Sequence, residues 1–290
     1  MPEGPEIRRA AHELGRALVG RVAGRVEFLV PRLAAHGARL SGQRIVAVTP
    51  RAKAMLIRFS GGQTVYSHNQ LYGRWQVTRA GREPATARAL RLTIANERHV
   101  ARLYSATDIE VLDEQGLAAH PYLARLGVDL LDPLTTVHAV RAAAEDARFR
   151  RRSLAGLLLD QGFYAGLGNY LRSEILYVTG LRHEERLGSL TSADRQRLAD
   201  TALALTRQAY RTRGVTNDLE RAAGLKARGV PFTAYRHRVF ARDGEPCWTC
   251  GDTVLRTDVA GRGIYYCPTC QPGTGTATAK RARATRRREY

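Results

Sequence analysis

The sequence lacks long apolar runs, which argues against a membrane-spanning helix. No stretch of its 290 residues approaches the roughly 20 consecutive apolar residues that a transmembrane helix needs. The first residues carry Glu3, Glu6 and Glu13, where a secretory signal would be basic and then apolar. We therefore expect a cytoplasmic protein with no membrane association, and one that meets the nucleoid if it binds DNA.

Cysteine is scarce, and its spacing argues against a secreted disulfide framework. The four cysteines form two pairs, Cys247 with Cys250 and Cys267 with Cys270, and sixteen residues separate the pairs. This spacing lets four thiolates converge on one zinc ion. Two disulfides or a redox dithiol are the alternatives, and the matched pairs in a reducing compartment disfavour both. We predict one structural zinc ion with no open position for chemistry.

Acidic residues are in the minority, and this indicates a polyanionic partner. The chain has 46 Lys and Arg against 27 Asp and Glu, a formal charge of +19. The last twenty residues hold six basic side chains and one acidic one, so most of the excess lies elsewhere. Such a surface favours nucleic acid, bound through phosphates without sequence preference. A content of 44% hydrophobic residues excludes a mainly disordered chain.

The first part of the chain is predicted to be mainly β. Apolar residues at helical spacing, with Pro5 in the first turn and Gly20 at the end, indicate a helix over residues 5–20. From residue 22 to 113, short stretches alternate apolar and polar residues, which is typical of strands and favours a sandwich. The alternation is lost over residues 114–135, which suggests a linker.

The second part is predicted to be mainly helical. Helical patterns recur over residues 136–147, 153–160, 169–180 and 192–212. Weak periodicity and several glycines favour a mobile loop over residues 214–236. After Cys270 the composition is typical of a disordered basic tail. The predicted domains are residues 1–120, 121–236, a zinc ribbon over 237–271, and the tail over 272–290.

The N-terminus offers a candidate nucleophile. Met1 is expected to be removed because Pro2 is small, and removal exposes a secondary amine. An α-amino group titrates near pH 8, so part of it is neutral and nucleophilic at physiological pH. An N-terminal proline alone is weak evidence, because most chain ends are loose.

Motifs spread along the chain strengthen that interpretation. Met1-Pro-Glu-Gly-Pro-Glu-Ile-Arg-Arg9 is followed by Arg51-Ala-Lys53-Ala, Tyr66-Ser-His-Asn-Gln-Leu-Tyr-Gly73, Leu157-Leu-Leu-Asp-Gln161, Ala165-Gly-Leu-Gly-Asn-Tyr-Leu-Arg172 and the cysteine pairs. In this order they resemble the formamidopyrimidine-DNA glycosylase and endonuclease VIII family, and the third motif resembles its endonuclease VIII branch. The resemblance implies an α+β multidomain fold: an N-terminal β-sandwich with flanking helices, a helical helix-two-turns-helix domain, and a zinc ribbon.

The resemblance also implies a bifunctional DNA glycosylase and AP lyase that excises oxidised pyrimidines in base excision repair. Pro2 would form a Schiff base with the damaged nucleotide, and β,δ-elimination would follow. Glu3 would act as general acid. Glu6 would orient this group, although a carboxylate in the first turn of a helix is favourable in any case. Lys53 would assist base excision and hold the phosphate beside the lesion.

Five further residues are implied in DNA binding. Gln70, Leu71 and Tyr72 would fill the gap that a flipped base leaves in the stack. The simpler alternative for Leu71 and Tyr72 is packing beneath a turn. Asn169 and Arg262 would bind phosphate. Their alternatives are a helix cap for Asn169 and a solvated turn arginine for Arg262.

Two other functions stay open. A glycosylase for oxidised purines shares Pro2, Glu3, Lys53 and the zinc ribbon, but its void-filling residues differ from those at 70–72. A non-catalytic zinc protein that binds DNA would keep the basic surface, yet the intact Pro2, Glu3 and Lys53 argue against it. We expect a monomer that binds damaged DNA.

Overall fold

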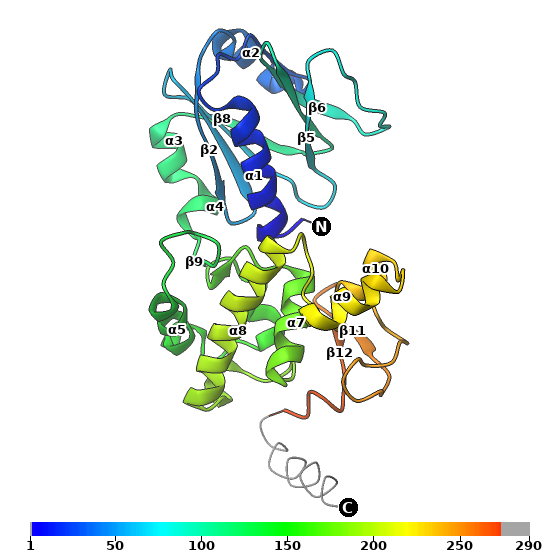
Figure 1. Cartoon of the computed structure of the whole chain (residues 1–290). Coiled ribbons are helices and arrows are strands. Elements are labelled where there is room, and N and C mark those ends of the chain that lie inside the picture. The colour runs from blue at the N-terminus through cyan, green and yellow to red at the C-terminus, as the bar shows by residue number, and fades with distance from the viewer. Residues whose placement is uncertain (1, 274–290) are drawn as a thin grey trace, which may run out of the picture. The chain divides into compact units, whose positions relative to one another are not determined.

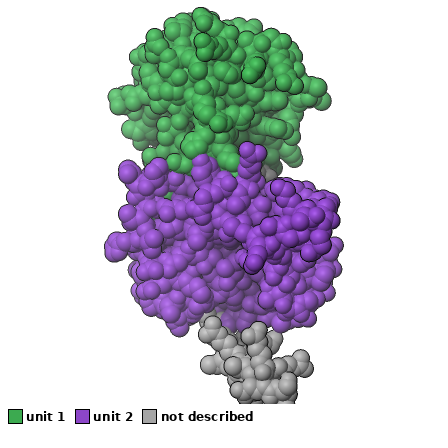
Figure 2. Space-filling model, in the orientation of Figure 1, with its two compact units in different colours: residues 1–129 green, residues 130–290 purple. Residues whose placement is uncertain are grey.

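The computed structural model describes residues 2–273, which fall into two compact units that divide after Asp129 (Figure 2). Unit 1 ends nine residues beyond the predicted boundary at 120. Unit 2 includes the predicted ribbon, whose status as a separate domain stays a prediction. The predicted tail lies outside the described residues, apart from Pro272 and Gly273. No described helix is long and apolar enough to cross a membrane.

Unit 1 contains two antiparallel four-stranded sheets, as a β-sandwich requires (Figure 1). One sheet has the strand order β1 (Arg25–Phe28), β6 (Leu90–Ala95), β7 (His99–Tyr104) and β5 (Arg74–Arg79). The other has the order β2 (Ile45–Arg51), β3 (Ala54–Phe59), β4 (Thr64–His68) and β8 (Asp108–Leu112).

Helix α1 (Gly4–Leu18) joins the core of both sheets. It begins with a capping box between Glu3 and Glu6, and its buried face includes Leu14 and Leu18, both 0% exposed. Burying each of these leucines contributes roughly 1.5–3 kcal/mol. The prediction of a helix here is confirmed, although the helix ends two residues before Gly20.

Several short elements of unit 1 escaped the sequence reasoning. The predicted strand region also holds η1 (Pro31–Leu33) and α2 (Ala34–Leu40). The predicted linker holds α3 (Glu114–Ala119), α4 (Pro121–Ala124) and β9 (Val128–Asp129). These elements are too short to show a period. The available signals were the capping side chains of Asp113 and His120, which accept hydrogen bonds from the first turns of α3 and α4.

Unit 2 is mainly helical, as predicted (Figure 1). Its central helix is α7 (Asn169–Thr179), which is buried on nearly every side between α8 (Ser192–Arg211) and the ribbon strand β12 (Arg262–Tyr266). The unit also contains α5 (Val137–Glu145), η2 (Ala147–Phe149), α6 (Leu154–Leu157), β10 (Tyr164–Ala165), η3 (Leu187–Ser189) and β11 (Leu255–Val259).

The prediction of a mobile loop over residues 214–236 is wrong. The segment contains α9 (Leu219–Ala227) and α10 (Phe232–Tyr235). Thr216, which precedes both helices, is 0% exposed and donates a hydrogen bond to the buried carboxylate of Glu174 at 2.7 Å. That carboxylate also accepts three backbone N–H groups from residues 238–240. The partner that orders the segment lies on α7, so local periodicity could not reveal it.

Candidate active site

Helix α1 and strand β2 place the N-terminus and Lys53 at the same end of unit 1. The two elements start from a shared end, where the Gly20 N–H donates to the Ile45 carbonyl at 2.9 Å. From there α1 runs back over 15 residues, about 22 Å, and β2 runs forward over 7 residues, about 23 Å. Because α1 packs along β2, Pro2 and the turn after β2 lie at the far end of both.

Glu3 and Glu6 are tied together at the start of α1. Glu3 is 1% exposed, and its backbone N–H donates to Oε2 of Glu6 at 3.1 Å. The other oxygen of Glu6 accepts from Arg9 at 2.7 Å. The two readings of Glu6 are therefore compatible, because one carboxylate caps the helix and fixes the backbone that carries Pro2 and Glu3.

Lys53 lies in the strained two-residue turn between β2 and β3, which two distant side chains hold in place. Ala52 has φ of 54°, a backbone conformation that residues with a side chain rarely adopt. Its N–H donates to the Asp129 carboxylate at 2.8 Å, and the N–H of Lys53 donates to the Tyr122 hydroxyl at 3.2 Å. Lys53 itself is 6% exposed. Sequence reasoning did not identify Asp129 and Tyr122, because nothing local links them to residue 53.

His68 is a further residue of this site that sequence reasoning did not assign, although it lies within the motif at residues 66–73. His68 is the last residue of β4, and it pairs across the sheet with Ala54 of β3, the residue that follows Lys53. Burial, and then the charge of Lys53, lowers the pKa of His68 to about 4. Its Nδ1 accepts the Gln70 N–H at 3.1 Å, so in the neutral ring the proton is on Nε2. His68 therefore offers a neutral N–H donor beside a lysine.

The turn after β4 exposes two large apolar side chains. Leu71 is 57% exposed and Tyr72 is 69% exposed, which rules out packing beneath the turn. Gln70 adopts φ of 48°. The N–H of Gly73 donates to the Asn69 carbonyl at 2.7 Å and closes the turn. Exposed apolar groups on a closed turn are suited to enter an apolar partner.

Two neighbouring loops fix this turn. Arg88 donates from Nη1 to the Tyr72 carbonyl at 2.7 Å. Thr107 donates its hydroxyl to Oε1 of Gln70 at 2.7 Å. Neither residue was assigned from the sequence, because both lie far along the chain from the turn they hold. The turn is therefore organised before any partner binds.

In unit 2, the predicted DNA-binding residues Asn169 and Arg262 are brought together. The side-chain amide of Asn169 donates to the Gly263 carbonyl at 2.7 Å. Asn169 is the first residue of α7 and Gly168 is the cap, so the helix-cap alternative for Asn169 is wrong. Arg262 is exposed beside the two-residue turn that joins β11 to β12. The buried Arg172 donates from Nη2 to Oδ1 of Asn169 at 2.6 Å and thereby orients the Asn169 side chain.

The four cysteines also converge in unit 2. Their Sγ atoms all lie within 4.8 Å of one another, with 3.8 Å between Cys247 and Cys270 and 3.4 Å between Cys250 and Cys267. Disulfide sulfurs would be about 2.05 Å apart, so neither of these two contacts is a disulfide, and all four cysteines are free. Four sulfurs around a tetrahedral zinc ion, each at about 2.3 Å, lie about 3.8 Å apart. The cluster therefore fits a metal ion of this kind.

Comparison with known proteins decides the family. Residues 1–106 match the formamidopyrimidine-DNA glycosylase N-terminal domain. Endonuclease 8 of Klebsiella pneumoniae strain 342 is 45% identical over 271 residues, which cover 93% of this chain and 100% of that protein. This chain belongs to the formamidopyrimidine-DNA glycosylase and endonuclease 8 family. The resemblance noted in the sequence is thus confirmed, and the chain is a DNA glycosylase with AP lyase activity in base excision repair.

Other relatives of this glycosylase agree. Endonuclease 8 of Escherichia coli O17:K52:H18 is also 45% identical, again over 93% of this chain. Formamidopyrimidine-DNA glycosylase of Lactococcus lactis, solved with AP-site DNA, has a TM-score of 0.74 at 20% identity and covers 93% of this chain and 99% of its own. The same enzyme solved with oxidised-pyrimidine DNA has a TM-score of 0.76. The predicted fold class is confirmed.

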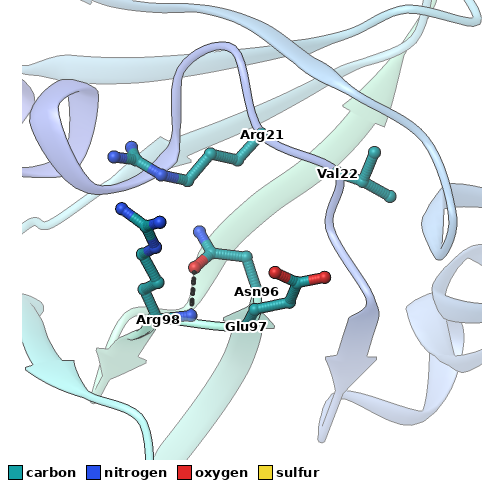
Figure 3. Close-up of a pocket in the computed structure, with 5 residues that line it drawn as sticks. All are labelled: Arg21, Val22, Asn96, Glu97 and Arg98. Atoms are coloured by element: carbon teal, nitrogen blue, oxygen red, sulfur yellow. Dashed lines mark hydrogen bonds between the residues drawn. The ribbon is translucent and has the colours of Figure 1, made fainter.

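A cavity of about 390 Å³ in the glycosylase, drawn in Figure 3, has none of these residues in its lining. It is lined by Arg21, Val22, Asn96, Glu97 and Arg98. The Asn96 side chain donates a hydrogen bond to the Ala17 carbonyl, which places the cavity at the C-terminal end of α1. The length of the helix puts that end about 22 Å from Pro2. None of the residues assigned to chemistry lines it, so we give it no part in the reaction.

Proposed function

We propose that this glycosylase excises oxidised pyrimidines and then cuts the strand by β,δ-elimination, with Pro2 as nucleophile. The observation that carries the proposal is the placement of Pro2 and the buried Glu3 at the end of unit 1 that also holds Lys53 and His68. The pyrimidine preference rests on the endonuclease 8 relatives and on the residues of the turn at 69–73.

The amine of Pro2 can start both reactions. After removal of Met1, its nitrogen attacks C1′ of the damaged nucleotide, and the bond from C1′ to the base breaks. The bond from C1′ to the ring oxygen O4′ then breaks as O4′ takes up a proton, which leaves an iminium ion that acidifies the protons on C2′. Loss of one of these protons expels the 3′ phosphate, and a further elimination expels the 5′ phosphate. A secondary amine suits this role because its condensation product is always a cationic iminium. A primary amine would give a neutral imine, which must first be protonated.

Glu3 and Lys53 supply the proton transfers and charge that these steps need. A buried carboxyl such as Glu3 can donate a proton to the sugar oxygen as the ring opens, and Glu6 holds it in position. Lys53 presents a point charge for the leaving base or the adjacent phosphate. Beside it, the neutral His68 can donate an N–H to an anionic oxygen.

The remaining assigned residues act on the DNA. Leu71 and Tyr72 enter the stack when the damaged base flips out, and Gln70 bonds the orphaned partner base. Their exposure on a closed turn supports this role. Asn169 and Arg262 bind the phosphate backbone, as their common position at a helix start and a hairpin turn suggests. A monomer in the cytoplasm, in contact with the nucleoid, suffices for this function.

Zinc is the metal that we assign to the cysteine cluster. Cys247, Cys250, Cys267 and Cys270 would hold one ion as four thiolates, and the ion would stabilise the ribbon that carries Arg262. Elemental analysis of purified protein is expected to give one zinc per chain. A Cys247→Ser variant that stays folded, active and zinc-free would contradict the structural role.

Borohydride trapping tests the main proposal. The reductant converts an iminium into a stable crosslink, which mass spectrometry can locate in the chain. We would compare duplexes that carry thymine glycol, 8-oxoguanine opposite cytosine, or an abasic site. The expected result is a crosslink at Pro2 that forms faster with thymine glycol than with 8-oxoguanine.

Each other result has a distinct meaning. Faster trapping with 8-oxoguanine would replace the pyrimidine preference by a purine preference. A crosslink at a residue other than Pro2 would overturn the assignment of the nucleophile. No crosslink and no cleavage on the abasic duplex would leave only DNA binding.

A further inference from the structure

The hydroxyl of Tyr177 lies among the cysteine sulfurs although Tyr177 belongs to α7 and not to the ribbon. Its oxygen is 3.1 Å from Sγ of Cys247 and 4.0 Å from Sγ of Cys270. The same oxygen is 2.8 Å from the Thr249 hydroxyl. Tyr177 is only 7% exposed, so water does not compete freely for these contacts.

The chemistry of the groups fixes the direction of the bond to sulfur. A cysteine that ligates a metal is a thiolate, which has no proton to donate. A tyrosine hydroxyl is protonated at neutral pH and can both donate and accept. Once the metal is bound, any hydrogen bond between these two atoms must therefore run from the hydroxyl of Tyr177 to the thiolate of Cys247. In this structure Tyr177 donates to the Thr249 hydroxyl. Rotation of the two hydroxyl protons lets Thr249 donate to Tyr177 instead, which frees the Tyr177 proton for the sulfur.

The ribbon supplies donors of its own at longer distances. The Thr249 N–H lies 3.5 Å from Sγ of Cys247, and the Cys270 N–H lies 3.5 Å from Sγ of Cys267. The hydroxyl of Tyr177 is closer to sulfur than either N–H. It is also the contact that links the sulfurs to α7, the helix that begins at Asn169.

We propose that Tyr177 is a positioning residue of the metal site, which donates a hydrogen bond to the Cys247 thiolate and slows loss of the metal. This inference rests on the proposed zinc site. Such a bond draws electron density from the sulfur, so the thiolate is less readily oxidised, and it fixes the sulfur toward the metal. The same contact ties the ribbon to α7.

The test compares zinc release from Tyr177→Phe and from the wild-type chain. The substitution removes the hydroxyl and keeps the ring in the core formed with Val239 and Val254. Partners of metal ligands typically change metal affinity by about 10-fold to 100-fold. We expect zinc transfer to a chromogenic chelator to be about tenfold faster in the variant, both without oxidant and after hydrogen peroxide.

A matched variant controls for the loss of a buried tyrosine hydroxyl. Tyr164 is 0% exposed in the same unit, and its hydroxyl bonds the Val140 carbonyl, far from any cysteine in the sequence. Tyr164→Phe is expected to release zinc at the wild-type rate. Equal release from wild type and Tyr177→Phe would overturn the proposal, and so would equal acceleration in both variants.

A second measurement needs no variant. In protein loaded with a spin-active cadmium isotope, the metal is expected to show scalar coupling to the hydroxyl proton of Tyr177 through Sγ of Cys247. Coupling to the Thr249 N–H, which faces the same sulfur, is the internal reference. Coupling to Thr249 without coupling to Tyr177 would refute the hydrogen bond. Absence of any metal in purified wild-type protein would instead refute the zinc site itself.

Discussion

Replacing Gly73 by alanine should separate base excision from strand cleavage. A Cβ atom at this position would lie 2.5 Å from the Asn69 carbonyl oxygen and 2.6 Å from its Cα. Ordinary contact requires at least about 3.4 Å, so the backbone of the turn must move by about 1 Å. The atoms in the way belong to the backbone, and no side chain can rotate to relieve the overlap.

The size of the effect follows from this displacement. The shift moves Leu71 and Tyr72, which we assign to filling the stack, but leaves Pro2 and Lys53 in place. A misplacement of 1 Å can cost about 100-fold in rate. We expect excision of thymine glycol to slow by about this factor. Elimination at a preformed abasic site should slow by less than about tenfold, because an unpaired site is easier to flip.

Single-turnover kinetics on the two duplexes measure both rates. Gly15→Ala is the matched control, because an added Cβ there meets nothing within 4 Å. It should leave both rates unchanged, and a thermal melt should show that each variant is folded at the assay temperature. If Gly73→Ala slowed excision and elimination equally, or slowed neither, the assigned role of the turn would be wrong.

Three further predictions concern other contacts. Arg88→Met removes the guanidinium that holds the Tyr72 carbonyl, so base excision should slow several-fold. Arg88→Lys keeps a donor, so this variant should excise the base faster than Arg88→Met. Equal excision rates in the two variants would contradict a hydrogen-bonding role. His68 has a pKa lowered to about 4, against about 6.5 when unfolded, so the unfolded state takes up this proton first as the pH falls. Stability that is present above about pH 6.5 should therefore be lost between pH 6.5 and 4, and urea unfolding of His68→Gln should show a smaller loss over that interval. Truncation at Pro272 removes six basic residues and should weaken nonspecific DNA binding and reduce its salt slope, and an unchanged slope would show that the tail makes no phosphate contacts.

Much of the architecture could be predicted because it depends on local pattern. The period of apolar residues in α1 and α8, the alternation in the strands of unit 1, and the spacing of the cysteines are all properties of consecutive residues. The short helices α3 and α4 and the segment at 214–236 were missed or misassigned. These elements are fixed by caps and by distant partners, such as Thr216 against Glu174.

The same division holds for the site. By itself the sequence determined the family and identified Pro2, Glu3 and Lys53 as candidates for the chemistry and the four cysteines as candidate metal ligands, because each lies in a recognisable local motif. Only the tertiary structure revealed what positions them. Asp129 and Tyr122 hold the turn that contains Lys53, and Tyr177 reaches the ribbon sulfurs from helix α7. Such contacts join residues tens of positions apart, and a hydrogen bond across that distance leaves no periodic trace in the chain.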